Sequence, residues 1–306
     1  MKFAKLLHNP GAGEGEYSKK ELIQMVQSAG YGCSYSSTKN DGWEKIESAE
    51  IDFIILAGGD GTVRKVADSL LKKRLLEKKY PIALLPMGTA NNIAKTLNIP
   101  RDNPDGVIES WHHSEIRKFD VGRIYGIKCP FFLESFGVGV FPELMQKMEK
   151  YEKKINDPEE SIRTALEVLR EIVEKAQARF CRLVIDGVEH RGNFIMVEVM
   201  NTRSMGPKLH IAPFADPFDG FFDVVMVTER EREQCLDYLD TLLQGKEEAS
   251  FFNVVRAKKL EMFYDGSNAH VDDEIVEIKK DTTVKLELLH GLLEFLIPAN
   301  GHAPIA

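Results

Sequence analysis

The sequence has little cysteine, with four residues in a chain of 306. They stand far apart, at Cys33, Cys129, Cys181 and Cys235. This spacing contains no C-x-x-C pair and no zinc-ligand pattern, and a disulfide framework is not expected in a chain of this length. A reducing, cytoplasmic environment fits such a composition.

Long apolar runs are also absent. The longest apolar stretches, such as Phe53–Ala57 and Leu292–Pro298, are much shorter than the ~20 residues that a helix needs to cross a bilayer. The opening residues MKFAKLLHNP lead into a glycine turn rather than into a small-residue cleavage site, so they predict a first strand and not a signal peptide. We therefore expect neither a membrane span nor a cleaved leader.

The chain lacks an excess of positive charge, because 40 Lys and Arg oppose 48 Asp and Glu and leave a formal net charge of −8. Neutralisation of phosphates by cations supplies most of the affinity for nucleic acid, so we expect no nucleic-acid partner. One local exception is Lys72-Lys73-Arg74 with Lys78-Lys79. This basic run is either a solvated helix end or a place of transient contact with the inner face of a membrane.

Residues 1–125 alternate between short apolar runs and helical patterns, which indicates a Rossmann-like α/β domain with a parallel sheet. We expect strands at Lys2–Leu7, Tyr31–Ser36, Ile51–Ala57 and Ile82–Leu85. Helices are expected at Lys19–Ala29 and after Thr62. The third strand is apolar at every position, which is typical of a central parallel strand.

Residues 126–290 are richer in aromatic and β-branched runs separated by Gly, Asp and Asn, which predicts an antiparallel second domain with few helices. Strands are expected at Phe180–Ile185, Asn193–Met200, Phe221–Val227, Val254–Phe263 and Thr283–Leu289. One helix is expected to begin after Asp157, with Pro158 at its first position. The tail, residues 290–300, contains one more apolar strand that could close either domain.

The most informative segment is the apolar strand that runs into Gly58-Gly59-Asp60-Gly61-Thr62 and then into an amphipathic helix. Glycines at a strand-to-helix turn let backbone N–H groups approach an anion, and the helix N-terminus favours negative charge. This predicts a phosphate cradle. An acid inside such a cradle implies a magnesium ion between carboxylate and phosphate oxygens, although Asp60 in a plain glycine turn could also be a helix cap.

Two further turns are expected beside the first. PMGTANN (residues 86–92) follows the next strand and NPGAG (residues 9–13) follows the first strand. The carboxyl ends of parallel strands share one edge of an open sheet, so all three turns should line one crevice. Thr89 and Asn91 would offer a hydroxyl and an amide to a nucleotide. No GxxxxGK[ST] sequence occurs, so the pattern is not that of a P-loop enzyme.

These three turns, in this order along the chain, resemble the diacylglycerol-kinase catalytic family, which includes bacterial lipid kinases, sphingosine kinases and ceramide kinases. The resemblance implies a nucleotide-binding α/β domain, a β-sandwich domain and a cleft between them. It also implies transfer of the γ-phosphoryl group of ATP, with Mg²⁺, to a lipid hydroxyl, most closely that of a diacylglycerol-like acceptor. A lipid substrate and transient membrane contact follow from it, and a homodimer is left open.

Residue by residue, the resemblance implies nucleotide contacts across the three turns and at one threonine outside them. The positions are Asn9, Pro10, Gly11, Ala12, Gly13, Thr38, Gly58, Gly59, Asp60, Gly61, Thr62, Val63, Arg64 and Thr89, and Asn91 is added to them from its place in the third turn. Arg64 stands where the family often has Asn, so it either contacts phosphate or points to solvent.

In the second domain, IAPFAD (residues 211–216) followed by DGFFD (residues 219–223) resembles the family segment that holds a structural magnesium. Asp216, Asp219 and the backbone of Phe221 fall at the ligand positions, although a hairpin turn rich in Asp and Gly would look the same.

The segment HVDDE (residues 270–274) falls where the family carries a D-G-E triplet, so Asp272 and Glu274 occupy the places of the general base. Alternation along a strand would put these two acids on one face and Asp273 on the other. Asp273 replaces the glycine of the triplet, which suggests a backbone conformation that Asp adopts at a cost. Without the resemblance, three consecutive acids indicate a solvated edge strand.

Two other functions remain open at this point. One is a kinase for a soluble acceptor, similar to NAD kinases. The other is a nucleotide or lipid sensor without turnover. The acceptor pocket is expected among apolar residues of the second domain, including Phe131, Phe132, Phe214 and Phe218, although a row of Phe in a β domain is more often core.

Overall fold

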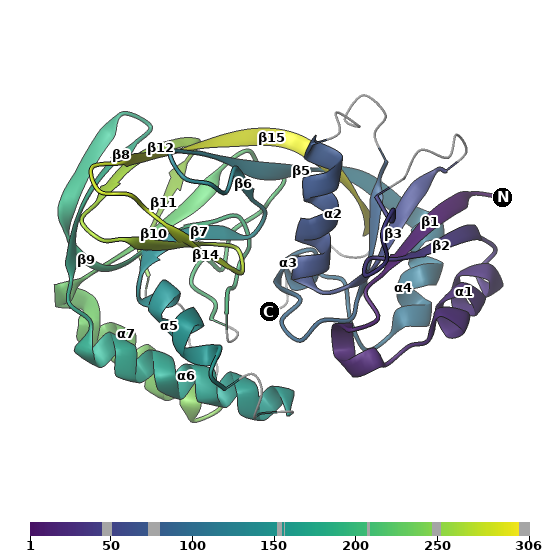
Figure 1. Ribbon diagram of the computed structural model, residues 1–306, viewed down its shortest axis with the longest axis horizontal. Helices are drawn as coiled ribbons and strands as arrows, with labels where there is room; N and C mark the ends of the chain where they lie inside the picture. The colour runs from purple at the N-terminus through teal and green to yellow at the C-terminus, as the bar shows by residue number, and fades with distance from the viewer. Residues whose placement is uncertain are drawn as a thin grey trace. The chain divides into compact units, whose positions relative to one another are not determined.

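The computed structural model describes residues 1–44, 51–72, 80–151, 155, 157–206, 209–246 and 252–299 (Figure 1). It divides into two compact units: unit 1 is Met1–Phe119 with the chain from His290 onward, and unit 2 is Asp120–Leu289. Most of the basic run at residues 72–79, and residue 300 of the expected tail strand, lie outside the described residues. Over the described ranges, no helix combines the length and apolar character needed to span a membrane.

Unit 1 contains a parallel sheet in the order β15-β4-β3-β1-β2. Its strands are β1 Phe3–His8, β2 Gly32–Ser37, β3 Phe53–Gly58, β4 Ile82–Pro86 and the end of β15 Thr283–Pro298. The predicted strands are confirmed with shifts of one or two residues at their ends. All of β3 is buried, as its apolar sequence indicates.

The helices of unit 1 follow the strands. They are α1 Lys19–Ser28, α2 Asp60–Lys72, α3 Asn92–Thr96 and α4 Pro104–Ser110. Figure 1 shows α2 and α3 on one side of the strands, and α1 and α4 on the other. The hydroxyl of Ser18 accepts the N–H of Glu21 at 3.3 Å while the Glu21 carboxylate accepts the N–H of Ser18 at 2.7 Å, a capping box that fixes where α1 begins.

Unit 2 is built from antiparallel strands, which confirms the predicted β-sandwich class. The strands are the end of β5 Ser114–Tyr125, β6 Phe131–Phe132, β7 Ser135–Gly139, β8 Arg179–Ile185, β9 Val188–Met200, β10 Phe222–Thr228, β11 Val254–Ala257, β12 Lys259–Tyr264, β13 Asn268–Val271, β14 Glu274–Glu277 and the start of β15. Its helices are α5 Val140–Met148, α6 Pro158–Lys175 and α7 Arg232–Leu243.

Alternation along β9 divides unit 2 into two cores. Val197 and Val199 face a core between strands, whereas Met196 and Met200 face a core shared with the helices. Glu198 lies on β9 between the two valines, so it belongs to the helix-covered face together with these methionines. A carboxylate in that position is unusual, because the surrounding residues are buried and apolar.

Three details of the sequence-based prediction are wrong. Val254–Phe263 is two strands rather than one, because the N–H of Lys258 donates to the carboxylate of Asp186 at 3.0 Å and the chain changes its strand partners there. The segments predicted as Thr283–Leu289 and Leu292–Ile297 form one strand, β15. Helices α5 and α7 were not predicted, because the aromatic and β-branched runs of this half of the chain indicate strands.

Candidate functional site

The three glycine-containing turns of unit 1 come together at one edge of the sheet, as predicted. The N–H of Asn9 donates to the carbonyl of Ala57 at 2.9 Å, and the N–H of Met87 donates to the carbonyl of Gly58 at 2.9 Å. A Cβ on Gly13 would stand 2.5 Å from the carbonyl oxygen of Met87. The turns after β1, β3 and β4 are therefore in direct contact through their backbones.

The second and third glycine turns meet at Gly59 and Gly88. A Cβ on Gly88 would stand 2.6 Å from the Cα of Gly59, so side chains at this contact would force the turns apart. Asn91 closes the turn after β4: its Oδ1 accepts the N–H of Gly88 at 2.8 Å and its Nδ2 donates to the carbonyl of Gly88 at 2.6 Å. Asn91 has a φ of 50° and is buried, so its side chain shapes the turn itself.

Asp60 begins α2, and its carboxylate caps the neighbouring helix α3. Its Oδ2 accepts the N–H of Asn92 at 2.8 Å and its Oδ1 accepts the N–H of Ile93 at 3.1 Å. The negative charge is favourable at this helix N-terminus. Each carboxylate oxygen has a second lone pair, so the cap and the predicted metal contact are compatible.

Thr62 is the third residue of α2, within the first turn of the helix, and is buried. Its hydroxyl oxygen accepts a hydrogen bond from the Asn9 side chain at 3.3 Å and covers Gly58 so closely that no Cβ would fit there. In contrast, Gly61 and Thr89 are exposed at the two turns. Arg64 is only 8% exposed, so the interpretation in which it points to solvent is wrong.

Thr38 and two lysines border the same edge. The N–H of Thr38 donates to the carbonyl of His8 at 2.8 Å, and the Nζ of Lys65 donates to the carbonyl of Thr38 at 2.5 Å. The side chain of Lys39 occupies the space above Gly11. Sequence analysis missed the two lysines as site residues, since neither belongs to a local motif. They place positive charge beside the predicted phosphate cradle.

In unit 2, the predicted metal ligands lie in a tight acidic turn. Asp216 Oδ1 accepts the N–H of Phe218 at 3.1 Å, and Asp219 Oδ1 accepts the N–H of Phe221 at 2.9 Å. Asp219 also forms an ion pair with Arg256. The fully buried Asp120 joins them, because its Oδ2 accepts the N–H of Gly220 at 2.8 Å.

This turn holds more negative than positive charge. Burial raises the pKa of Asp219, Arg256 opposes this, and Asp216 and Asp120 add to the raise. Burial and the charge of Asp219 raise the pKa of Asp223 to about 6, again against Arg256. A cation held by carboxylate and carbonyl oxygens would relieve this repulsion, and these are the ligands that Mg²⁺ prefers. Over the described ranges, no three His, Cys, Asp or Glu side chains are grouped to hold a metal, so such a site would need the backbone carbonyl as well.

The predicted catalytic acids lie on the hairpin of β13 and β14, but not along one strand. Asp272 and Asp273 form the turn, and only Glu274 begins a strand. The expected alternation is therefore wrong. The carboxylate of Asp272 accepts the backbone N–H groups of Leu133, Glu134 and Ser135 at 2.8–3.1 Å, which anchors the turn to the segment before β7.

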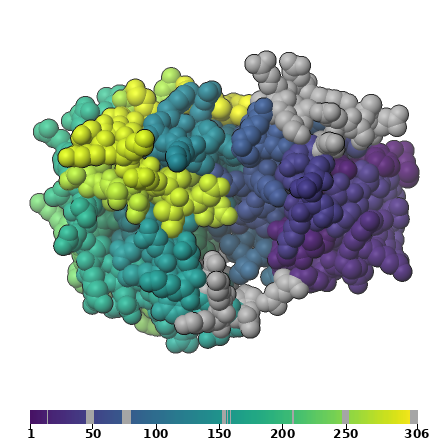
Figure 2. Space-filling model, viewed as in Figure 1, coloured from purple at the N-terminus to yellow at the C-terminus, as the bar shows by residue number. Residues whose placement is uncertain are grey.

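The concern about Asp273 in place of glycine is also resolved. The residue with positive φ is Asp272, at 51°, whereas Asp273 has no such strain. Asp272 can adopt this conformation because Asp tolerates the left-handed region better than most residues and its side chain is held by hydrogen bonds. Asp273 and Glu274 are exposed, and Figure 2 shows the yellow-green hairpin at the surface of unit 2.

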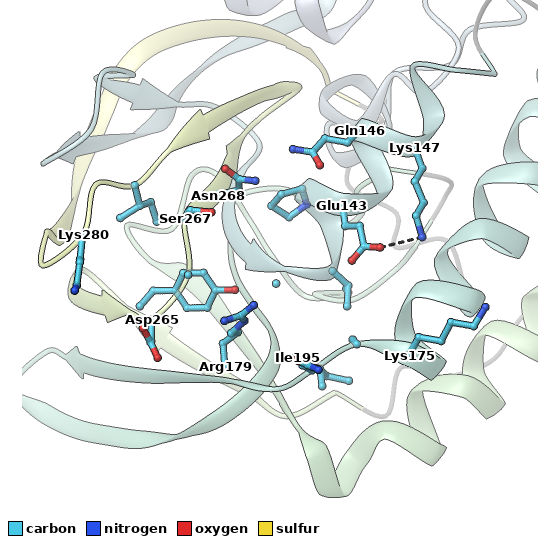
Figure 3. A pocket seen from close by; sticks show the side chains of 18 of the residues that line it. Glu143, Gln146, Lys147, Lys175, Arg179, Ile195, Asp265, Ser267, Asn268 and Lys280 are labelled. Carbon is cyan, nitrogen blue, oxygen red and sulfur yellow. Dashed lines mark ion pairs between the residues drawn. The ribbon is translucent and has the colours of Figure 1, made fainter.

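A separate cavity of about 1120 Å³ lies in unit 2, at the Asn268 end of β13 and thus away from the Asp272 turn (Figure 3). Its lining includes five cationic side chains, Lys147, Lys150, Lys175, Arg179 and Lys280, and three carboxylates. Lys147 pairs with one of these, Glu143, at 2.9 Å. The cavity is partly apolar at Val140, Ile195 and Phe263.

The phenylalanines expected around an acceptor do not line this cavity. Phe132 is fully buried in the core, 5.1 Å from the ring of Phe222, and Phe131 is also buried. Phe214 is 91% exposed. The interpretation of Phe132 as core is therefore the correct one.

Two family models match the chain. The diacylglycerol kinase catalytic domain matches residues 4–124, and the YegS C-terminal NAD kinase beta sandwich-like domain matches residues 147–296. A diacylglycerol kinase of Bacillus subtilis is 27% identical over 260 residues, covering 80% of each chain, and one of Mycobacterium tuberculosis is 27% identical over 259 residues, covering 82% of this chain and 78% of that protein.

Solved structures share the fold. A diacylglycerol kinase from Bacillus anthracis has a TM-score of 0.71 at 22% identity, covering 97% of this chain and 96% of that chain. An NAD kinase from Archaeoglobus fulgidus in complex with ATP has a TM-score of 0.51 at 13% identity, covering 98% and 95%. At these identities the likeness concerns the fold alone.

Proposed function

The chain belongs to the diacylglycerol kinase catalytic family and is a lipid kinase, and on this premise we propose that it transfers the γ-phosphoryl group of ATP to the hydroxyl of a diacylglycerol-like lipid. The observation that carries the proposal is the meeting of three glycine turns, with Asp60 among them, at one edge of the unit 1 sheet.

For the nucleotide, we assign the phosphates to the turns after β1, β3 and β4. Gly61 in the first turn of α2 is exposed, so an anion could approach this helix N-terminus, and Lys39 and Lys65 add positive charge nearby. Asp60 would hold Mg²⁺, which neutralises charge on the phosphate oxygens when bound. Thr38, Thr89 and Asn91 stay assigned to the nucleotide's surroundings, with Asn91 acting by shaping its turn.

For the general base, we favour Glu274 over Asp272. The Asp272 carboxylate already accepts three backbone N–H groups, and these anchor the turn. Glu274 is exposed directly beside that turn. It would accept the proton of the lipid hydroxyl as the oxygen attacks phosphorus, while Asp272 holds the hairpin in place.

For a second cation, we propose that Asp216, Asp219 and the carbonyl of Phe221 hold a structural Mg²⁺ in unit 2. The support is the grouping of carboxylates at this turn, since Asp216 and Asp120 raise the pKa of Asp219 and Asp219 raises the pKa of Asp223. Its contribution would be to stability, because these residues shape a turn rather than reach a substrate.

For membrane contact, we propose that the cationic rim of the unit 2 cavity faces anionic lipid. A kinase with a lipid acceptor meets that acceptor at a membrane surface, and each Lys or Arg near an anionic leaflet contributes attraction. Figure 3 shows Lys147, Lys175, Arg179 and Lys280 from separate elements around the cavity, which is how a headgroup would be surrounded.

An acceptor screen tests the function. Purified protein would be incubated with labelled ATP, Mg²⁺ and mixed vesicles containing diacylglycerol, a sphingoid base or phosphatidylglycerol, with NAD and sugars as soluble acceptors. We expect label in the lipid phase with diacylglycerol. Label only in the soluble products would favour the NAD-kinase-like alternative, and ATP binding without any labelled product would favour a sensor.

The base assignment has its own test. Glu274→Gln should lower kcat by about 100-fold or more and leave the KM for ATP nearly unchanged, because a missing base acts on the chemical step. Asp272→Asn keeps an acceptor for the loop and should lower kcat much less. Equal activity of Glu274→Gln and the wild type would refute Glu274 as the base.

A further inference from the structure

Behind the hairpin that carries the proposed base lies a buried pair of titratable side chains. His270 Nε2 and Glu198 Oε2 are 2.8 Å apart, and both side chains have no exposed surface. His270 lies on β13 and Glu198 on β9, with β7 between them in the sheet. The two residues are 72 positions apart in the sequence, and no local motif links them.

The chemistry of the contacts fixes where the protons are. His270 Nδ1 is 3.1 Å from the carbonyl oxygen of Asp272, and a carbonyl only accepts, so Nδ1 carries hydrogen. The 2.8 Å contact between Nε2 and Oε2 then requires one proton, held by either atom. The pair is thus either imidazolium with carboxylate or neutral imidazole with carboxylic acid, and both forms contain one shared proton.

The residues around His270 and Glu198 leave space for both side chains. The Glu198 carboxylate lies against Gly137 of β7, where even a Cβ would collide with it. The ring of Phe141 from α5 lies 6.1 Å from the imidazole, and Val225 of β10 is the register partner of Glu198. Glu198 Oε1 is buried and has no hydrogen-bond partner among the described residues, so a carboxylate is retained here at a cost that packing alone does not explain.

We propose that His270, held by Glu198, is the positioning residue for the catalytic hairpin, and that loss of their shared proton releases the turn and lowers turnover. The imidazole connects the buried Glu198 to the carbonyl of Asp272, while the Asp272 carboxylate holds the segment before β7. Glu274 follows two residues after Asp272 in the sequence, at the start of β14. This inference rests on the proposed function, because it concerns how Glu274 is positioned.

The electrostatics give the direction of the pH effect. Burial lowers the pKa of His270, while the charge and hydrogen bond of Glu198 and the carbonyl and charge of Asp272 raise it, and the net direction is a raise. Burial raises the pKa of Glu198, with His270 opposing. Among the described residues, the charged groups that shift the pKa of His270 are Glu198 and Asp272, and the one that shifts the pKa of Glu198 is His270. The contacts from β7, α5 and β10 named above are uncharged. A group whose pKa is raised in the folded state contributes stability below its unfolded pKa and loses that contribution as pH rises through its folded pKa, so the shared proton is lost in the alkaline direction.

The test compares variants in lipid-vesicle kinase assays between pH 6 and pH 10. His270→Phe approximately keeps the side-chain volume and removes the N–H that donates to the carbonyl of Asp272, so kcat should fall about tenfold to 100-fold while the KM for ATP stays within about twofold.

In Glu198→Gln, the amide N–H can still donate to His270 Nε2, so the hydrogen of His270 stays on Nδ1. The amide does not lose a proton in this pH range. We expect this variant to turn over near the wild-type rate at neutral pH and to lack the wild-type fall at high pH. His190→Gln, on the same strand β9, is the matched control and should leave both the rate and the profile unchanged.

Two results would overturn the inference: a wild-type kcat in His270→Phe, or an unchanged alkaline fall in Glu198→Gln. If His270→Phe fails to fold, the nearly isosteric Glu198→Gln still decides through its pH profile. Thermal unfolding supplies a readout that needs no activity, because the wild type should lose stability at high pH more than Glu198→Gln does, and equal losses would refute the shared proton. An inactive wild type would instead refute the proposed function, and this unfolding comparison would then be the remaining test of the pair.

Discussion

The carboxylate of Asp60 accepts the backbone N–H of Asn92 at 2.8 Å, so one side chain joins the start of α2 to the start of α3. Both helices follow glycine turns that we assign to the nucleotide. Asp60 therefore has a structural function that is visible in the fold and a proposed metal function that is not. The two functions can be separated, because Asn keeps one acceptor oxygen for the cap of α3 but carries no charge.

The first prediction uses this difference. Asp60→Asn should lower the free energy of unfolding by about 1–3 kcal/mol, since the amide oxygen can still accept one N–H of α3 but the amide NH2 cannot accept the other. Its kinase activity should fall at least about 100-fold, because a neutral amide cannot neutralise Mg²⁺ beside phosphate. Denaturant unfolding and the labelled-lipid assay measure the two effects.

A control for this prediction is Asn103→Ala, which removes the cap that Asn103 gives to Gly106 at the start of α4. This loss should cost about 0.5–2 kcal/mol of stability and leave activity unchanged. If Asp60→Asn keeps full activity and its dependence on Mg²⁺, Asp60 is a cap only and the kinase site has been wrongly assigned.

The second prediction concerns the contact of Gly59 with Gly88. Gly88→Ala places a methyl group 2.6 Å from the Cα of Gly59 and 2.8 Å from the Oδ1 of Asn91, so both the backbone and the Asn91 side chain would have to move. We expect a loss of about 1–3 kcal/mol in stability and a clear rise in the KM for ATP, because the two turns separate. Gly192→Ala, whose new Cβ would meet nothing nearer than 3.6 Å, is the control. An unchanged KM in Gly88→Ala would show that this contact does not shape the nucleotide site.

Much of unit 1 could be predicted because its signals are local. A strand such as β3 is apolar throughout, and the glycines after it mark the turn. Parallel strands then bring such turns to one edge without further information. The hydrogen bonds that the Asp60 carboxylate accepts from α3 could not be predicted, because a helix cap is normally expected from the residue before the helix.

In unit 2 the candidate site residues are held by contacts between residues far apart in the sequence, and local sequence patterns do not predict such contacts. Asp272 looked like a strand residue, since its neighbours alternate, but three N–H groups 137–139 residues away hold it in a turn. Asp120 and Arg256, which complete the acidic turn, lie far from Asp219 in the chain. Pairings across a sheet are fixed by tertiary packing, so no window along the sequence contains them.

The third prediction concerns the acidic turn of unit 2. Removing divalent cations with a chelator should lower the Tm, and adding Mg²⁺ should restore it, because binding to the folded state stabilises it. In Asp219→Asn this response should be lost. Asp240→Asn breaks a similar ion pair, between Asp240 and Arg170, and should lower stability but keep the response to Mg²⁺. A full response in Asp219→Asn would exclude this carboxylate as a ligand.

The last prediction concerns the cationic rim of the unit 2 cavity. The double variant Lys175→Glu and Lys280→Glu should bind vesicles rich in phosphatidylglycerol at least about 30-fold more weakly than the wild type does, since each cation near an anionic surface contributes about 1 kcal/mol and the new carboxylates add repulsion. Vesicle sedimentation measures this binding at several salt concentrations, and the difference between the proteins should shrink at high salt because the charges are screened.

The control is Arg191→Glu, which reverses the charge of one exposed residue of β9 outside the cavity and should leave vesicle binding unchanged. Turnover of a short-chain, water-dispersed acceptor should be the same for all three proteins, because neither lysine lies on the hairpin of Glu274. Equal vesicle binding by the double variant and the wild type would move the membrane contact elsewhere on the protein.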